Sequence, residues 1–124
     1  TVDCVIGGYT DPEGSRQYFG SIVLGLYDKQ GRLIHVGQAG TGFNQAMLKE
    51  IWQLLKELET ERSPFYGKVD AAHVHWLKPE RVAEIKFSEW THETADGGVK
   101  LRAPVFIGLR EDKDPKECTF AEQT

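Results

Sequence analysis

The chain has 124 residues and a mass of 14.0 kDa, which suits one domain and leaves no room for a two-domain enzyme. Apolar residues make up 40% of the chain and charged residues 27%, so a folded core is feasible without a metal or a disulfide. Fifteen Lys and Arg against nineteen Asp and Glu give a net charge of −4, whereas nucleic-acid-binding domains usually carry a basic excess. Composition alone therefore argues against a nucleic-acid binder.

The two ends of the chain bear on its processing and its compartment. It begins Thr1-Val2-Asp3 without an initiator Met or a signal segment, which predicts a processed product or a piece of a longer protein. No apolar run approaches the roughly 18 residues that a transmembrane helix needs. Cys4 and Cys118 stand at opposite ends without CxxC spacing, which is more typical of free thiols in a reducing compartment than of a disulfide.

Three β-type segments open the chain. Residues 3–10 are rich in Val, Ile and Tyr, and residues 18–27 are almost continuously apolar, which predicts a central strand covered on both faces. Residues 33–39 return as a third strand after a short hairpin loop. Gly25 and Gly37 lie inside these strands, where glycine usually marks a bulge or a bend. A small barrel needs such bends in order to close.

One helix is expected, over residues 44–61. Asn44 is a suitable N-cap, and Ser63-Pro64 ends the helix because the residue before proline is pushed out of the α region. The apolar residues at helical spacing are Leu48, Ile51, Trp52, Leu55 and Leu58.

The remaining strands complete the prediction of the fold. Residues 82–91 alternate between apolar and polar, a loop is expected at 92–98, and a last strand starts near Val99 and ends before Pro104. The order β-β-β-α-β-β predicts an all-β domain with one helix, a five-stranded OB-fold Greek-key barrel. A small α+β sandwich is the competing fold, and the glycine-bent strands and single interposed helix favour the barrel.

The C-terminal run from 99 to 116 carries a positive excess in a chain that is acidic overall. Its charge is +2, which leaves −6 for the rest of the chain. A charge run is usually a solvated face, so the simplest interpretation is an exposed loop after the last strand. The charged residues are the basic Lys100, Arg102, Arg110, Lys113 and Lys116 and the acidic Glu111, Asp112 and Asp114.

The spacing inside this run is more specific than its charge. Residues 102–113 read R-x-P-x-F-x-G-x-R-x-D-K, which resembles the C-terminal nucleotidyltransferase motif of ATP-dependent DNA ligases. The resemblance covers residues 3–117 and is closest to the bacterial end-joining and archaeal-like branches. Other segments resemble the OB domain of these ligases in the same order: VIGGY at 5–9, GSR at 14–16, FGSIVLGLY at 19–27, GTGF at 40–43, WLKP at 76–79 and VAEIKFSEWT at 82–91.

The resemblance implies that residues 1–124 are the single C-terminal OB-fold domain of a longer ligase that repairs and recombines DNA by end joining. In this family an upstream adenylation domain of the same chain carries the lysine that attacks the α-phosphate of ATP, and Mg²⁺ accompanies the triphosphate. The chain itself lacks that lysine, so we expect it to be inactive alone. The implied protein is a cytoplasmic, nucleoid-associated monomer with no membrane partner.

The resemblance also implies roles for the closing motif. Arg110 and Lys113 would orient the pyrophosphate leaving group, which suits a reaction that depends on positioning and charge neutralisation. Arginine supplies a planar fork for phosphate oxygens, and lysine a point charge. Arg102 is a further candidate on the nucleotide side. Asp112 would orient its basic neighbours, or it is simply a turn residue.

After AMP transfer, family members turn the OB domain so that another face clamps the nicked double-stranded DNA. Arg16, which follows Ser15, is the expected phosphate contact. Thr41 and Gly42 precede a helix N-terminus, which is either an anion site or a plain capped turn. Lys86 either follows the DNA backbone or is an ordinary surface lysine.

Several alternatives and departures remain. The rival functions are a stand-alone OB module for single-stranded nucleic acid and the OB domain of an RNA ligase or mRNA-capping enzyme. Many ligases carry Lys at the position of Ile107 and a basic residue at that of Gln38, so this domain alone should bind DNA weakly and with strong salt dependence. His73 and His75 share a strand face if extended, but they lack a third ligand, so no metal site is expected.

Overall fold

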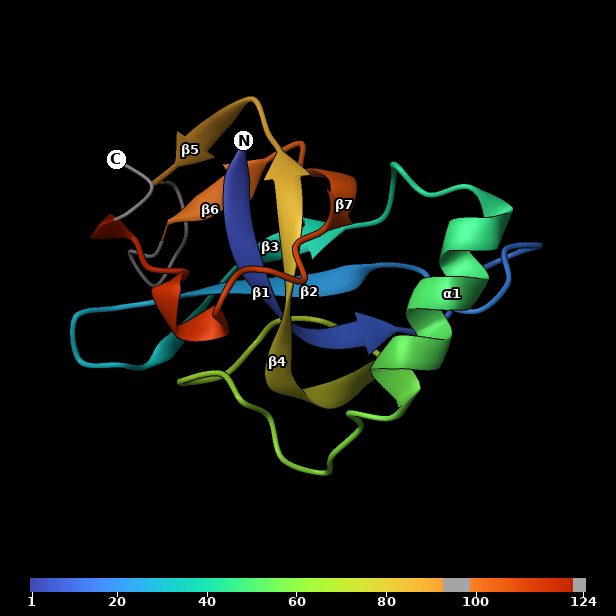
Figure 1. The fold of residues 1–124 in the computed structure, drawn as a ribbon, viewed down its shortest axis with the longest axis horizontal. Helices are drawn as coiled ribbons and strands as arrows, with labels where there is room; N and C mark the ends of the chain where they lie inside the picture. Colours follow the sequence, from blue (N-terminus) through green and yellow to red (C-terminus); the bar gives the residue numbers. More distant parts are fainter. Residues whose placement is uncertain (93–98, 122–124) are drawn as a thin grey trace.

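An antiparallel sheet of five strands, in the order β3-β2-β1-β4-β7, forms the body of the domain, and a two-stranded sheet of β5 and β6 adjoins it (Figure 1). The structure, a computed structural model, describes residues 1–92 and 99–121. In the part of the chain that it describes, no helix is long and apolar enough to cross a membrane. The elements are β1 Val2–Thr10, β2 Ile22–Tyr27, β3 Leu33–Ala39, α1 Gln45–Lys56, β4 Val74–Lys86, β5 Glu89–Thr91, β6 Lys100–Arg102, β7 Val105–Leu109 and the short 3₁₀ helix η1 Pro115–Glu117.

Strand β1 is the central strand, and it bends in the middle (Figure 1). The pairing slips at Gly7: Ile6 pairs with Arg81 of β4, whereas Gly8 pairs with Trp76. Four residues of β4 therefore face one residue of β1, and Pro79 is among them. Proline cannot donate to a ladder, so it is tolerated in a sheet at such an irregularity.

A buried aromatic ring explains two of the strand glycines. A Cβ at Gly7 would stand 2.5 Å from the ring of Phe65, and a Cβ at Gly25 would stand 2.7 Å from it. Phe65 is only 6% exposed, and it fills the space that these two glycines leave. The glycines are thus needed for close packing, in addition to the bends that the sequence predicts.

The two edges of the five-stranded sheet meet through the segment that follows β3. The backbone N–H of Phe106 in β7 donates to the carbonyl of Thr41 at 3.0 Å. Gly42 has a φ of +98°, and a Cβ there would stand 2.1 Å from the Phe106 carbonyl oxygen. Phe43 stacks on Phe106 with ring centroids 4.4 Å apart. This closure gives the partly open barrel of an OB-fold, so the predicted fold class is confirmed.

Helix α1 follows this closure and covers the core with three buried residues, Leu48, Ile51 and Leu55. Asn44 is its N-cap, as predicted: the side-chain oxygen accepts a hydrogen bond from the backbone N–H of Met47 at 2.8 Å. The helix ends at Lys56, so the predicted end at residue 61 is wrong. The chain after the helix pairs with β4 instead of continuing the helix, since the N–H of Lys78 donates to the carbonyl of Leu58 at 2.8 Å.

Two predicted strand starts are also wrong. Strand β2 begins at Ile22 and not at residue 18, because Tyr18 has a φ of +75°, which breaks extended backbone. Strand β4 begins at Val74 and not at residue 82, because its first residues pair with the second half of β1. The irregularity around Pro79 hides this continuity from the sequence pattern.

The predicted end of the last strand before Pro104 needs a correction as well. A turn at Ala103, with a φ of +52°, separates β6 from β7, and β7 pairs with β4 beyond the proline. The fifth strand of the main sheet is therefore β7. It lies inside the charged run 99–116, for which charge alone predicts an exposed loop. Most of the loop expected at 92–98 lies outside the described residues. Both cysteines are buried, and burial raises the pKa of the Cys4 thiol.

Replacing Gly42 by Ala should lower the free energy of unfolding by about 2–4 kcal/mol, because the new Cβ meets the Phe106 carbonyl and the backbone stays left-handed. Gly67→Ala is the matched control: Gly67 has a φ of +78°, but nothing lies within 4 Å of a Cβ there. The control should lose only the backbone term, about 1 kcal/mol. Urea denaturation measures both variants, and equal losses would contradict a role for the close approach.

Candidate functional site

The segment from Arg110 to Phe120, here called the C-terminal arm, carries the charged motif residues. Figure 1 shows the arm running from β7 across β4 and β1 to η1. At one end the N–H of Arg110 donates to the carbonyl of Val82 at 2.8 Å, and at the other the N–H of Tyr27 donates to the carbonyl of Cys118, also at 2.8 Å. The arm is therefore fastened to the sheet at both ends and is more ordered than a solvated loop.

Arg110 lies between two carboxylates. Its Nη1 is 3.3 and 3.4 Å from the two side-chain oxygens of Asp3 on β1, and its Nε donates to Asp112 at 3.2 Å. The hydrogen bond from Arg110 lowers the pKa of Asp112, and Asp112, followed by Asp3, raises the pKa of Arg110. Both shifts favour the charged forms of Arg110 and Asp112 near neutral pH, so the arm presents an oriented cation at the surface.

Lys113 lies on the same tight turn, since its backbone N–H donates to the carbonyl of Arg110 at 3.5 Å. Asp114 then caps η1, with its side chain accepting from the N–H of Lys116 at 3.0 Å. The structure thus brings together three of the four residues predicted for the nucleotide side: Arg110, Asp112 and Lys113. Their roles stay predictions.

Arg102, the fourth, lies elsewhere. It is on β6 and pairs with Glu89 of β5 at 2.9 Å, with 66% of its side chain exposed. Its carbonyl accepts from the N–H of Ser88, just beyond the Lys86 end of β4, whereas Arg110 bonds to Val82 on the same strand. The length of β7 separates the two arginines, so the structure does not place Arg102 beside Arg110 and Lys113.

The residues predicted to contact DNA gather around the β3–α1 segment. Nη1 of Arg16 donates to the carbonyl of Gly40 at 2.6 Å, and its guanidinium carbon is 5.7 Å from the Phe43 ring centroid. This contact brings Ser15 and Arg16 beside the exposed Thr41 and Gly42. The Nε of Arg16 is buried and has no hydrogen-bond partner among the described residues.

Lys86 joins this region through the backbone. It pairs in register with Val105, the neighbour of the Phe106 whose N–H reaches Thr41. The lysine is exposed at the end of β4. All five residues predicted for DNA contact therefore lie near the junction of the sheet edges, and their roles stay predictions.

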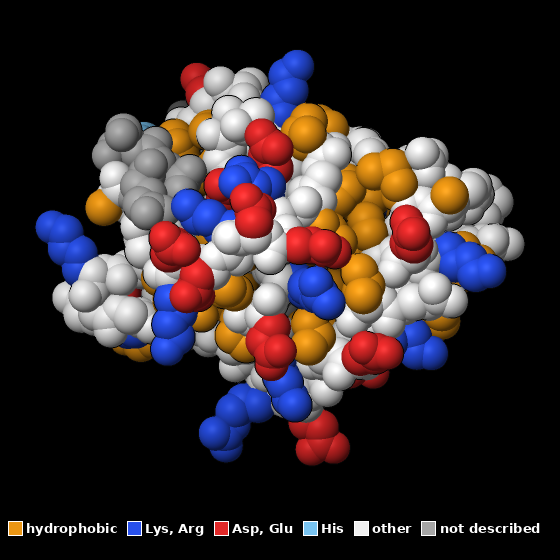
Figure 2. Space-filling model, viewed as in Figure 1, with side chains coloured by type: hydrophobic (Ala, Val, Ile, Leu, Met, Phe, Trp, Pro, Cys, Tyr) orange, Lys and Arg blue, Asp and Glu red, His pale blue; other side chains and the backbone are white. Residues whose placement is uncertain are grey.

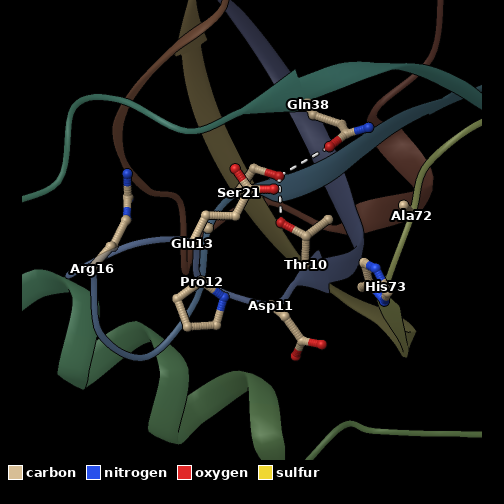
Figure 3. Close-up of a pocket in the computed structure, with 10 residues that line it drawn as sticks. Thr10, Asp11, Pro12, Glu13, Arg16, Ser21, Gln38, Ala72 and His73 are labelled. Atoms are coloured by element: carbon tan, nitrogen blue, oxygen red, sulfur yellow. Dashed lines mark hydrogen bonds between the residues drawn. The ribbon is translucent and has the colours of Figure 1, made fainter.

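A surface hollow of about 810 Å³ opens beside Arg16 (Figure 3). Across its floor the hydroxyls of Thr10 and Ser21 lie 2.8 Å apart, and the Ser21 hydroxyl donates to the side-chain oxygen of Gln38 at 3.0 Å. Figure 3 shows Arg16 on one side of this chain of polar groups and His73 on the other. Sequence reasoning missed Thr10 and Ser21, although a serine inside the apolar run at 19–27 was an available signal.

The two histidines do not share a strand face. His73 precedes β4 with a φ of +55°, whereas His75 on β4 stacks on Tyr9, 2.6 Å from Asp11 and 3.1 Å from Glu59. The hydroxyl of Tyr9 also donates to Glu59. Among residues 1–92 and 99–121, no group of three or more His, Cys, Asp and Glu side chains is arranged to hold a metal ion.

Comparison with known proteins identifies the family. The profile described as "ATP dependent DNA ligase C terminal region" matches residues 15–113. The multifunctional non-homologous end joining protein LigD of Pseudomonas aeruginosa is 40% identical over 121 residues, which cover 93% of this chain and 14% of that protein. LigD of Mycolicibacterium smegmatis is 43% identical over 124 residues, covering 97% and 16%. A DNA ligase of Methanoculleus marisnigri is 39% identical over 119 residues, covering 94% and 20%.

Solved structures agree with these matches. The ligase domain of LigD from Mycobacterium tuberculosis superposes with a TM-score of 0.82 at 36% identity, covering 95% of this chain and 37% of that one. A mycobacterial DNA ligase D complexed with ATP and MES gives a TM-score of 0.78 at 34% identity, covering 95% and 36%. The chain therefore belongs to the ATP-dependent DNA ligase family, and it corresponds to the C-terminal region of these enzymes.

Proposed function

We propose that this domain serves an ATP-dependent DNA ligase in two steps, first in the adenylylation of the catalytic lysine and then in holding nicked duplex DNA for sealing. The observation that carries the proposal is the anchored turn that presents Arg110 and Lys113 on one surface. The relatives are several times longer than this chain, and an adenylation domain in the same polypeptide would supply the nucleophile. The ATP in the mycobacterial structure supports ATP as the nucleotide.

In the first step the lysine amine forms a bond to the α-phosphorus of ATP, and pyrophosphate leaves. Arg110 and Lys113 would meet the β- and γ-phosphates, where negative charge accumulates as the bond to the leaving group breaks. A planar guanidinium held in one orientation contributes most to such a step, because it needs no reorganisation during the reaction. The family implies Mg²⁺ with the triphosphate, and the described residues of this domain offer no cluster that fits it.

In the second step the junction of the sheet edges would face the DNA. Arg16 is braced against Gly40, so its charge is fixed beside the exposed backbone of Thr41 and Gly42, with Ser15 and Lys86 near by. The hollow next to Arg16 is lined in part by Gln38, which stands where many ligases have a basic residue.

The net charge of −4 makes intrinsic affinity for DNA low. Figure 2 shows Lys and Arg interspersed with Asp and Glu across the face that carries the arm, without one continuous basic patch. A tether to the adenylation domain offsets this weakness, because it raises the effective concentration of the domain at the nick. The proposal therefore assigns the domain a role as part of a larger enzyme.

In the intact ligase, Arg110→Ala and Lys113→Ala should each slow adenylylation on the order of 100-fold, because charge on the leaving group is no longer neutralised. Transfer of labelled AMP from ATP to the enzyme measures this step. Sealing of pre-adenylylated nicked DNA should change far less. Lys116→Ala, on the same arm, is the control and should leave adenylylation intact. Equal loss in both steps would contradict the assignment.

Arg16→Ala in the intact ligase should weaken binding to nicked duplex on the order of tenfold and lower the slope of log affinity against log salt by about one. Fluorescence anisotropy over a salt series measures both quantities. Adenylylation should be unchanged. Arg32→Ala removes an arginine of similar exposure that pairs with Asp28, away from this junction, and should leave the salt slope as it is.

The purified 124-residue chain should seal no nicks, because the nucleophilic lysine is absent. Its affinity for nicked duplex should be weak, with dissociation constants above about 1 μM at physiological salt. Tight binding to single strands with none to nicked duplex would instead indicate a single-strand-binding module. Sealing by the chain, free of contaminating ligase, would refute the proposed division of labour.

A further inference from the structure

We propose that Asp3 is a positioning residue for the adenylylation step, which holds the Arg110 guanidinium in the orientation that meets the departing pyrophosphate. The inference rests on the proposed function, since it gives Asp3 a role through Arg110 alone. Asp3 would touch neither ATP nor DNA. The two residues are 107 positions apart, so no sequence motif joins them.

The contact is made by a well-supported carboxylate. Asp3 lies on β1, where it pairs in register with Glu84 of β4, and its side chain is only 17% exposed. Both of its oxygens are within 3.4 Å of Nη1 of Arg110. A carboxylate on a strand paired in the sheet cannot move far, so the guanidinium is fixed relative to the sheet and not merely to its own turn.

The second carboxylate on Arg110 is of a different kind. Asp112 is 77% exposed and lies two residues away on the same arm. An incoming triphosphate repels both carboxylates, and the exposed one can swing into solvent, whereas Asp3 is held by its strand. We therefore infer that Asp3 keeps Arg110 oriented when the triphosphate binds, whereas the contact with Asp112 is exchanged for one with phosphate.

The geometry also leaves room for the phosphates. The contacts of Arg110 use Nε and Nη1, and no hydrogen bond from Nη2 is made to any residue within 1–92 or 99–121. An arginine can donate five N–H bonds, so a guanidinium held at Nε and Nη1 still offers the N–H groups of Nη2 to phosphate oxygens. Pinning matters because a misplacement of about 1 Å can cost two orders of magnitude in rate.

The test uses the intact ligase and the isosteric substitution Asp3→Asn, which keeps the shape of the side chain and removes its charge. Adenylylation at saturating ATP should fall on the order of tenfold, because the guanidinium loses its fixed orientation. The KM for ATP should stay level or fall, since a negative charge near the triphosphate is gone. Asp3→Glu, which restores a carboxylate, should recover part of the rate. Sealing of pre-adenylylated nicked DNA bypasses the adenylylation step, so it measures how much of the variant is folded. This activity should be unchanged.

Two further variants complete the design. Glu111→Gln is the matched control, because Glu111 is acidic and adjacent to Arg110 but is 4.0 Å from Arg81 instead. It should leave adenylylation intact. The double variant Asp3→Asn with Arg110→Ala should be no slower than Arg110→Ala alone, because both changes act on one group.

The outcomes separate the two proposals. If Arg110→Ala slows adenylylation and Asp3→Asn does not, the positioning role is refuted and the proposed function stands. If Arg110→Ala itself has no effect on adenylylation, the proposed function fails. A loss of sealing that parallels the loss of adenylylation in Asp3→Asn would show a structural lesion and would also overturn the positioning role.

Discussion

The central strand β1 is the constraint on which the rest of the domain depends. It pairs with β2 on one side and with β4 on the other, so a slip of register would break two ladders at once. Its side chains from Cys4 to Ile6 are fully buried. Side chains that contact the two ends of β1 are therefore held at a fixed distance and orientation relative to one another.

The hollow beside Arg16 and the carboxylate that holds Arg110 lie at opposite ends of this strand. Asp3 near its start holds Arg110 of the arm, and Thr10 at its end lines the hollow beside Arg16. Tyr9, stacked on His75 and bonded to Glu59, stiffens that second end. Under the proposed function, the domain would meet a nucleotide in one step and a DNA duplex in another, which needs two such surfaces on one rigid body. The bend at Gly7 lets a single strand serve both.

Much of this organisation could be predicted from the sequence, and the failures have physical causes. The fold class, Asn44 as N-cap and the clustering of Arg110 with Lys113 follow from local periodicity, capping chemistry and motif spacing. The start of β4 could not be predicted, because Pro79 and the irregular pairing opposite Gly7 interrupt the alternation on which such predictions rest. The strand beyond Pro104 could not be predicted, because a proline that cannot donate to a ladder indicates a strand end, whereas the turn at Ala103 lets the chain pair with β4 again after it. The ion pair of Asp3 with Arg110 depends on contacts between distant parts of the chain, and single-sequence patterns carry no such information.

The fastening of the arm at Cys118 sets where the functional unit ends. The family profile stops at residue 113, immediately after the last motif lysine, yet the carbonyl that holds the arm to Tyr27 belongs to Cys118, and Thr119 continues that pairing. A boundary drawn at the motif would keep every charged side chain of the motif and leave the turn tethered at one end only. Part of the free energy of nucleotide binding would then be used to order the loosened turn. In the intact domain, the entropy cost of ordering the turn is offset during folding. Under the proposed function, the residues just past the motif would therefore contribute to its affinity without taking part in its chemistry.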